Sequence, residues 1–155
     1  MARPRSDTAE LSASDGDQLS RHSVRCYHLC MASILIVEDA ADACEPLAKF
    51  LEKNGHDVTC VANGREALAA VLSKVPDVVV LDLLTPEMDG PSFLEVVRSY
   101  LRLQSLPVVV LTGLTDSPMV DRARYLKVNS ILAKGKATLE DVQRAVEEAV
   151  HRLPG

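Results

Sequence analysis

The feature that most constrains the fold is a set of short apolar runs that each end in a polar residue. These runs cover residues 34–37, 78–81, 108–111 and 131–133. Short runs rich in β-branched residues are typical of strands that are buried on both faces of a parallel sheet. In an open sheet of this kind, ligands bind outside the carboxyl ends of the strands. The polar residues that follow the runs are therefore predicted to converge on one cleft.

Helical patterns separate these runs, so that strand and helix alternate five times from residue 33 onward. Helix-end signals include Asn54-Gly55, Asp89-Gly90-Pro91 and a capping-box-like Thr138 to Asp141 segment. With right-handed crossovers, this alternation predicts an α/β fold with a doubly wound, five-stranded parallel sheet in the order 2-1-3-4-5 and helices on both faces. The expected strands are 33–38, 57–61, 77–82, 107–112 and 130–133, and the expected helices are 42–54, 64–74, 91–103, 118–127 and 139–152.

Residues 1–32 differ from the rest, because they are rich in Ser, Asp and Arg and show no sustained period. We interpret them as a disordered N-terminal extension, with Met31 as a possible true start, and residues 33–153 as the folded domain. Cys26 and Cys30 flank His28, but no further zinc ligands lie nearby. Cys44 and Cys60 are interpreted as separate thiols, since a disulfide framework is not expected in a reducing compartment.

The charge balance argues against some classes of partner. The chain has a net charge of −5, and residues 1–32 are neutral, so the folded part carries the whole negative charge. An acidic domain is a poor electrostatic partner for nucleic acid or for an anionic membrane. The sequence also has no apolar stretch of spanning length and no signal-like N-terminus. We therefore expect a cytoplasmic protein that binds neither nucleic acid nor membrane.

The polar residues at the ends of the runs form a candidate site. Glu38 and Asp39 follow the first run, Asp82 follows the second, Thr112 the third and Lys134 the fourth. Three carboxylates, a hydroxyl and an ammonium suit a site for a divalent cation and a phosphoryl group.

The segment from Asp82 to Gly90, Asp-Leu-Leu-Thr-Pro-Glu-Met-Asp-Gly, makes the interpretation more specific. Together with the acidic pair, Thr112 and Lys134, it resembles the receiver domain of two-component response regulators, over residues 33–152. The resemblance implies a flavodoxin-like fold and a phosphoprotein whose phosphoacceptor is Asp82. It also implies Mg²⁺ bound by Glu38, Asp39, Asp82 and the backbone carbonyl of Leu84, with Thr112 and Lys134 contacting the phosphoryl group.

By the same resemblance, the phosphoryl donor would be a sensor histidine kinase or a histidine phosphotransfer protein. The chain would then be a stand-alone receiver without catalytic turnover, which relays the signal to an unknown downstream protein by a conformational change or by onward phosphotransfer. Two departures from the family keep a phosphorylation-independent docking module as an alternative: Gly135 replaces the usual proline after Lys134, and Ile131 replaces an aromatic residue. An aspartate-nucleophile phosphohydrolase is a weaker alternative, because Leu84 stands where such enzymes carry a second aspartate.

Overall fold

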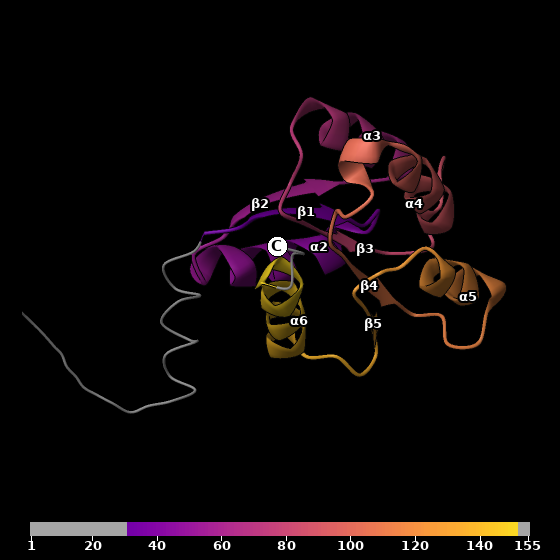
Figure 1. The fold of residues 1–155 in the computed structure, drawn as a ribbon. Helices are drawn as coiled ribbons and strands as arrows, with labels where there is room; N and C mark the ends of the chain where they lie inside the picture. Colours follow the sequence, from indigo (N-terminus) through magenta and orange to yellow (C-terminus); the bar gives the residue numbers. More distant parts are fainter. Residues whose placement is uncertain (1–30, 152–155) are drawn as a thin grey trace, which may run out of the picture. The chain divides into compact units, whose positions relative to one another are not determined.

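The computed structural model describes residues 31–151, in which strands and helices alternate along the chain (Figure 1). The expected extension and the Cys26–His28–Cys30 group therefore lie outside the described residues, apart from Met31 and Ala32. No described helix is both long enough and apolar enough to cross a membrane. The elements are β1 (Ser33–Val37), α2 (Ala41–Lys53), β2 (Asp57–Val61), α3 (Gly64–Ser73), β3 (Val78–Leu81), α4 (Gly90–Ser99), the 3₁₀ helix η2 (Leu101–Leu103), β4 (Val108–Thr112), α5 (Pro118–Tyr125), β5 (Ser130–Ala133) and α6 (Leu139–His151).

The five strands form one parallel sheet in the order β2-β1-β3-β4-β5, which confirms the predicted topology. The strand register determines where the polar residues lie. Val37 at the end of β1 is opposite Val61 of β2 and Leu81 of β3. The residues directly after β1 and β3 are therefore side by side at the carboxyl edge of the sheet.

Apolar side chains cover both faces of the sheet, because successive strand residues point to opposite sides. Leu35, Val37 and Leu81 pack on one face with residues of α3, α4 and α5, around the fully buried Phe93. Ile34, Ile36 and their neighbours pack on the other face with α2 and α6. Figure 1 shows the same division of the helices. Strands buried on both sides explain why the apolar runs are continuous rather than alternating.

Side-chain caps fix the start of four helices, and in α5 the Ser117 hydroxyl accepts a hydrogen bond from the backbone N–H of Met119 at 3.1 Å. The side chain of Asn63 accepts a hydrogen bond from the backbone of Glu66 at 2.8 Å, and Asp89 accepts one from Ser92 at 2.8 Å. Thr138 and Asp141 cap each other's backbone N–H groups at 2.9 and 3.0 Å, which confirms the predicted capping box. These caps begin α3, α4 and α6 where the sequence indicated.

Helix α2 starts differently, without a side-chain cap at Ala40. It begins at Ala41, so Pro46 lies in its second turn. Proline has no N–H, so it cannot make the usual bond to the carbonyl of Asp42 four residues earlier. The first turn of α2 is therefore held less firmly by its own backbone than the first turns of the capped helices.

The helix expected over residues 91–103 ends earlier, at Ser99, and a short 3₁₀ helix follows it. Arg98 lies at this break, and its guanidinium donates hydrogen bonds to the carbonyls of Leu103, Leu106 and Leu126 at 2.9–3.2 Å. These bonds tie the end of α4 to the segment 103–106 that follows it and to the end of α5. The periodicity of the sequence did not reveal the break because the apolar positions continue through it.

Cys44 and Cys60 are joined in a disulfide, so their interpretation as separate thiols is wrong. Cys44 is in the first turn of α2, Cys60 is in the neighbouring strand β2, and their Cα atoms are 6.8 Å apart. Helix α2 packs against β2, and this packing brings together two cysteines separated by 16 positions in the sequence.

His56 is buried between the start of β1 and α6, with 7% of its surface exposed. Its Nδ1 accepts a hydrogen bond from the backbone N–H of Ala32 at 3.2 Å, and its Nε2 lies 3.2 Å from the side-chain amide of Gln143. Burial lowers the pKa of His56, and the nearby charge of Glu147 offsets this only in part. The folded state therefore favours the neutral ring.

We expect this histidine to make stability depend on pH. The pKa of His56 is lower in the folded chain than in the unfolded chain, so the unfolded state takes up a proton first as pH falls through about 6.5. The free energy of unfolding should consequently decrease between about pH 7 and pH 5. Urea unfolding at several pH values should show this decrease for the wild type and a smaller one for His56→Asn, which keeps an acceptor but does not titrate. Equal slopes for both proteins would contradict the prediction.

Candidate functional site

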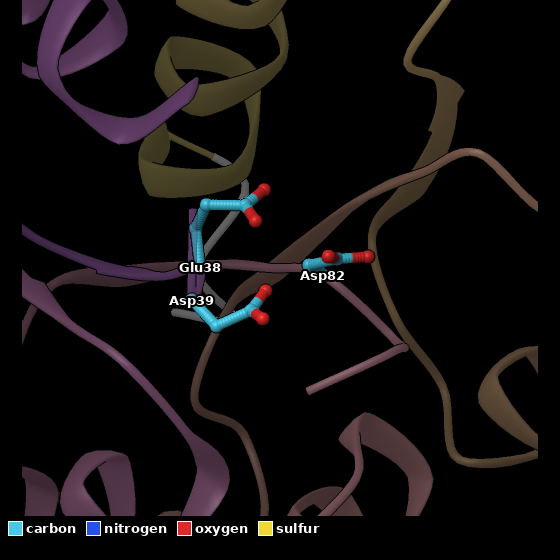
Figure 2. A group of neighbouring side chains, drawn as sticks. All are labelled: Glu38, Asp39 and Asp82. Atoms are coloured by element: carbon cyan, nitrogen blue, oxygen red, sulfur yellow. The ribbon is translucent and has the colours of Figure 1, made fainter. Parts of the chain in front are cut away.

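Three acidic side chains meet at the carboxyl edge of the sheet. Glu38 and Asp39 follow β1, Asp82 follows β3, and Figure 2 shows them converging from these strand ends. One carboxylate oxygen from each residue lies within 4.8 Å of the others. Glu38 and Asp82 are buried, and Asp39 is exposed. Hard oxygen ligands at this spacing fit a divalent cation such as Mg²⁺.

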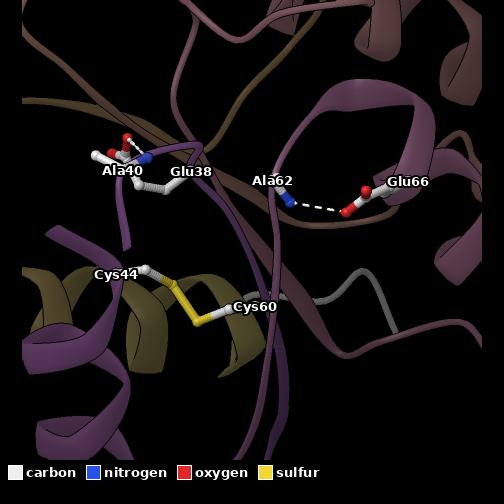
Figure 3. The surroundings of a disulfide bond; sticks show 6 residues. All are labelled: Glu38, Ala40, Cys44, Cys60, Ala62 and Glu66. Carbon is white, nitrogen blue, oxygen red and sulfur yellow. Dashed lines mark hydrogen bonds between the residues drawn. A yellow bond between two sulfur atoms is a disulfide. The ribbon is translucent and has the colours of Figure 1, made fainter. Parts of the chain in front are cut away.

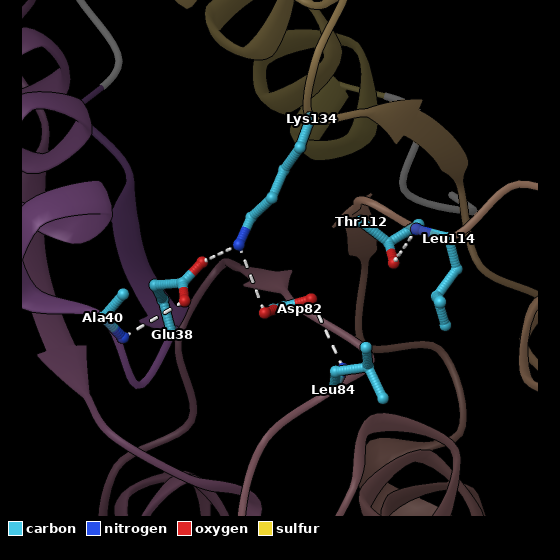
Figure 4. Close-up of polar contacts among 7 residues, drawn as sticks. All are labelled: Glu38, Ala40, Asp82, Leu84, Thr112, Leu114 and Lys134. Carbon is cyan, nitrogen blue, oxygen red and sulfur yellow. Dashed lines mark hydrogen bonds and ion pairs between the residues drawn. The ribbon is translucent and has the colours of Figure 1, made fainter.

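Lys134 lies over the acids from the loop after β5. Its Nζ is 2.5 Å from Glu38 Oε1 and 3.2 Å from Asp82 Oδ2 (Figure 4). Burial alone would lower the pKa of Lys134, but its hydrogen bond to Glu38 and the negative charges of Asp82 and Glu38 raise it overall. The lysine therefore remains a cation and neutralises part of the acidic cluster.

Two further predicted residues take part in local hydrogen bonds at the same edge (Figure 4). Asp82 Oδ1 accepts a hydrogen bond from the backbone N–H of Leu84 at 3.3 Å. Thr112 Oγ1 accepts one from the backbone N–H of Leu114 at 3.1 Å, and Thr112 is almost fully buried. The backbone N–H of Lys134 donates to the carbonyl of Thr112 at 2.9 Å, which ties the loop after β5 to the end of β4. Every predicted side chain is thus placed at this edge, while their chemical roles stay predictions.

The loop that follows Asp82 is held by hydrogen bonds that the sequence analysis did not identify. Thr85 Oγ1 donates to the carbonyl of Met88 at 2.8 Å, and the backbone N–H of Gly64 donates to the same carbonyl at 3.1 Å. The backbone N–H of Gly90 donates to the carbonyl of Leu83 at 2.9 Å. A Cβ on Gly64 would lie 2.3 Å from the carbonyl oxygen of Met88, so only glycine fits there. The loop signature therefore describes a braced turn that starts at Asp82.

Glycine is not sterically required at two positions close to the site, Gly113 and Gly135. A Cβ at Gly113 or at Gly135 would meet no atom within 4 Å, and neither residue has a left-handed φ. The peptide bond from Lys134 to Gly135 is trans, as are all the others among residues 31–151.

The comparison with protein families agrees with this site. The family model described as the response regulator receiver domain matches residues 34–147. The chain belongs to this family. It is therefore a receiver domain of two-component signal transduction, and the resemblance drawn from its motifs is confirmed. Receiver domains of this family interact with histidine kinases or with phosphotransfer proteins.

Individual relatives agree on the domain and differ in what surrounds it. A protein-glutamate methylesterase/protein-glutamine glutaminase of Archaeoglobus fulgidus is 32% identical over 123 residues, 77% of this chain and 34% of that protein. The DNA-binding response regulator MtrA of Mycobacterium tuberculosis is 38% identical over 84 residues, 54% of this chain and 36% of that protein. The signal receiver domain of a histidine kinase from Syntrophus aciditrophicus has a TM-score of 0.71 and 31% identity, over 77% of this chain and 90% of that one.

The chain spans about a third of the length of these two curated relatives. Methylester hydrolysis and DNA binding are therefore properties of the longer proteins. For this chain, the stand-alone arrangement, the absence of catalytic turnover, the cytoplasmic location and the absence of nucleic-acid binding stay predictions.

Proposed function

We propose that this receiver accepts a phosphoryl group on Asp82 from a phosphohistidine of a histidine kinase or a histidine phosphotransfer protein, with Mg²⁺, and passes the signal to a downstream protein. One observation carries the proposal: the Asp82 carboxylate lies within 4.8 Å of two other carboxylates and 3.2 Å from the Lys134 ammonium. A carboxylate in this setting has a counter-ion for the incoming phosphoryl group and a place for a cation beside it.

In the proposed reaction, a carboxylate oxygen of Asp82 attacks phosphorus, and an acyl phosphate bond forms as the P–N bond of the phosphohistidine breaks. The other ring nitrogen of the phosphohistidine carries a proton when the P–N bond breaks, so the imidazole leaves as the neutral ring. Lys134 lies on the Asp82 side of the cleft and would donate hydrogen bonds to the phosphoryl oxygens in place of its present bond to Asp82. Thr112 would donate its hydroxyl hydrogen to another oxygen, because within residues 31–151 its Oγ1 acts as an acceptor, for the backbone N–H of Leu114.

Glu38, Asp39 and Asp82, with the carbonyl of Leu84, would hold the Mg²⁺ ion. When bound, the ion supplies positive charge that offsets the repulsion between the carboxylate and the anionic phosphoryl group. Glu38 is also bonded to the backbone N–H of Ala40 at 3.2 Å, which orients its carboxylate. The backbone N–H of Glu38 donates to the carbonyl of Val61 at 3.0 Å. Residues 38–39, called the acidic turn below, are therefore held through both the main chain and the side chain of Glu38.

The test is to treat the full chain with a small phosphodonor, such as phosphoramidate, in the presence of Mg²⁺ and to record the intact mass. We expect a gain equal to one phosphoryl group, and the gain should be lost when EDTA replaces Mg²⁺. The phosphoryl linkage of the modified protein should survive mild acid and hydrolyse in base, which would identify it as an acyl phosphate. If the chain gains no mass with the small phosphodonor or with a phosphorylated histidine kinase, the result would support the docking-module alternative instead.

A second prediction concerns the metal ligands. Asp39 is the exposed member of the acidic cluster, so Asp39→Asn removes one negative oxygen ligand without opening the core. Mg²⁺ affinity should fall by at least about 10-fold, because even residues that only orient a metal ligand are typically worth roughly 10–100-fold. Calorimetric titration would measure this change, with Asp42→Asn as the matched control, because Asp42 is an exposed aspartate on α2 outside the cluster. Equal affinities for the two variants would argue against a metal role for Asp39.

A further inference from the structure

The Cys44–Cys60 disulfide lies next to the acidic turn and is not part of the proposed reaction (Figure 3). Its two residues differ in exposure: Cys44 is buried, with 5% of its surface exposed, and Cys60 is an exposed residue of the edge strand β2. An external thiol could therefore reach Cys60 more easily than Cys44. A disulfide with one accessible sulfur is a candidate for thiol–disulfide exchange.

The expected cellular setting makes a purely structural disulfide a poor explanation. This step rests on the proposed function, because a histidine kinase makes its phosphohistidine from a nucleoside triphosphate, and that pool lies in the reducing compartment of the cell. Disulfides in proteins of such a compartment are usually transient and act in catalysis or redox sensing. A reversible bond is therefore the more consistent interpretation of this pair.

Each cysteine is connected to the acidic turn through a short path of hydrogen bonds. On one side, the backbone N–H of Cys44 donates to the carbonyl of Ala40 at 3.0 Å, and the backbone N–H of Ala40 donates to Glu38 Oε2 at 3.2 Å. On the other side, Val61, the neighbour of Cys60, accepts the backbone N–H of Glu38 at 3.0 Å. The disulfide thus joins the two supports that position Glu38.

The start of α2 also depends on an outside restraint. It has no side-chain cap at Ala40, and Pro46 removes a backbone hydrogen bond in the second turn. The covalent bond from Cys44 to β2 compensates for these two weaknesses. When it is reduced, the first turn of α2 keeps its backbone hydrogen bonds to the carbonyl of Ala40 and the packing of Cys44 and Leu47, but it loses its covalent link to β2. The acidic turn should then sample more conformations.

We propose that Cys44 and Cys60 form a reversible redox site. Glu38, Asp39 and Asp82 bind Mg²⁺ with higher affinity when the disulfide is formed than when it is reduced. The substrate class is a dithiol reductant. Its thiolate attacks the sulfur of Cys60, the Cys44 thiolate leaves, and the second thiol of the reductant resolves the mixed disulfide. Two electrons and two protons pass to the cysteines, which become thiols, and the reductant becomes a disulfide. Oxidation is the reverse exchange with a disulfide such as oxidised glutathione.

The experiment compares Mg²⁺ titrations of the full chain in its oxidised form and after treatment with dithiothreitol, with thiol counting by mass to define each state. Mg²⁺ should bind about five-fold or more weakly to the reduced protein, a size typical of coupling between two sites. Because coupling is reciprocal, saturating Mg²⁺ should shift the equilibrium of this disulfide with a glutathione buffer by the same factor. That second measurement checks the coupling independently of the titrations.

Variants separate this pair from the other thiols. Cys60→Ser should bind Mg²⁺ like the reduced wild type and should not respond to dithiothreitol, and its exposed position makes the substitution mild. A Cys26→Ser/Cys30→Ser variant should keep the full response. The proposal would be overturned by equal Mg²⁺ affinities in the two redox states, or by failure of oxidised glutathione to form the bond. If Mg²⁺ affinity depends on the redox state but Asp82 is not phosphorylated, the redox proposal stands and the proposed function fails.

Discussion

Replacing Asp82 by asparagine is expected to abolish phosphorylation by both a small phosphodonor and a histidine kinase. Asparagine keeps the shape of the side chain but lacks the carboxylate that would attack phosphorus, and an amide is not a nucleophile for this transfer. Intact-mass measurement should therefore show no gain of a phosphoryl group in Asp82→Asn under conditions that modify the wild type. A gain of the same size in the variant would place the acceptor elsewhere.

The loss should come from chemistry and not from unfolding. Asp82 is buried, with 7% of its surface exposed, beside two other carboxylates and the Lys134 ammonium group. Removing one negative charge from this cluster relieves repulsion, so the free energy of unfolding without Mg²⁺ should not fall. Asp42→Asn is the matched control, since it makes the same chemical change on the exposed side of α2 and should leave phosphorylation intact. A large drop in melting temperature for Asp82→Asn would contradict this explanation.

The sequence predicted the sheet and the location of the site for a physical reason. Parallel strands buried on both faces appear as continuous apolar runs, and the residue after each run must emerge at the carboxyl edge. Glu38 and Asp82 follow runs that are aligned by the pairing of Val37 with Leu81, so their meeting is a result of register. The caps at Asn63, Asp89 and Thr138 can also be predicted from the sequence, because each bonds to a residue only three positions later.

Features that depend on contacts between distant segments were not predictable in the same way. The disulfide requires α2 to pack over β2, and the spacing of Cys44 and Cys60 in the sequence does not predict this packing. Lys134 was expected to approach Asp82, but its shorter contact is with Glu38, because the loop after β5 comes over the end of β1 as well as β3. Gly64 appeared to be an ordinary residue at the start of a helix, although its backbone contacts the loop that follows Asp82.

That contact leads to the second large effect, which is expected for Gly64→Ala. The new methyl group would lie 2.3 Å from the carbonyl oxygen of Met88, and both atoms belong to rigid segments: the first turn of α3 and the braced loop 83–90. Backbone must move to relieve this overlap, so the cost should reach about 3 kcal/mol, the upper part of the range for overpacking. Urea unfolding should show this loss of stability, and phosphorylation should slow because the loop begins directly after Asp82.

The control uses another glycine that is close to the site but not to any obstructing atom. Gly135 follows Lys134, and a Cβ there would meet nothing within 4 Å. Gly135→Ala should change the free energy of unfolding by less than about 1 kcal/mol, and the sign should favour the folded state because alanine restricts the unfolded chain. If both substitutions cost the same, the steric explanation at Gly64 fails. If Gly64→Ala is as stable as the wild type, the loop after Asp82 can shift away from α3, and its bracing is weaker than its hydrogen bonds indicate.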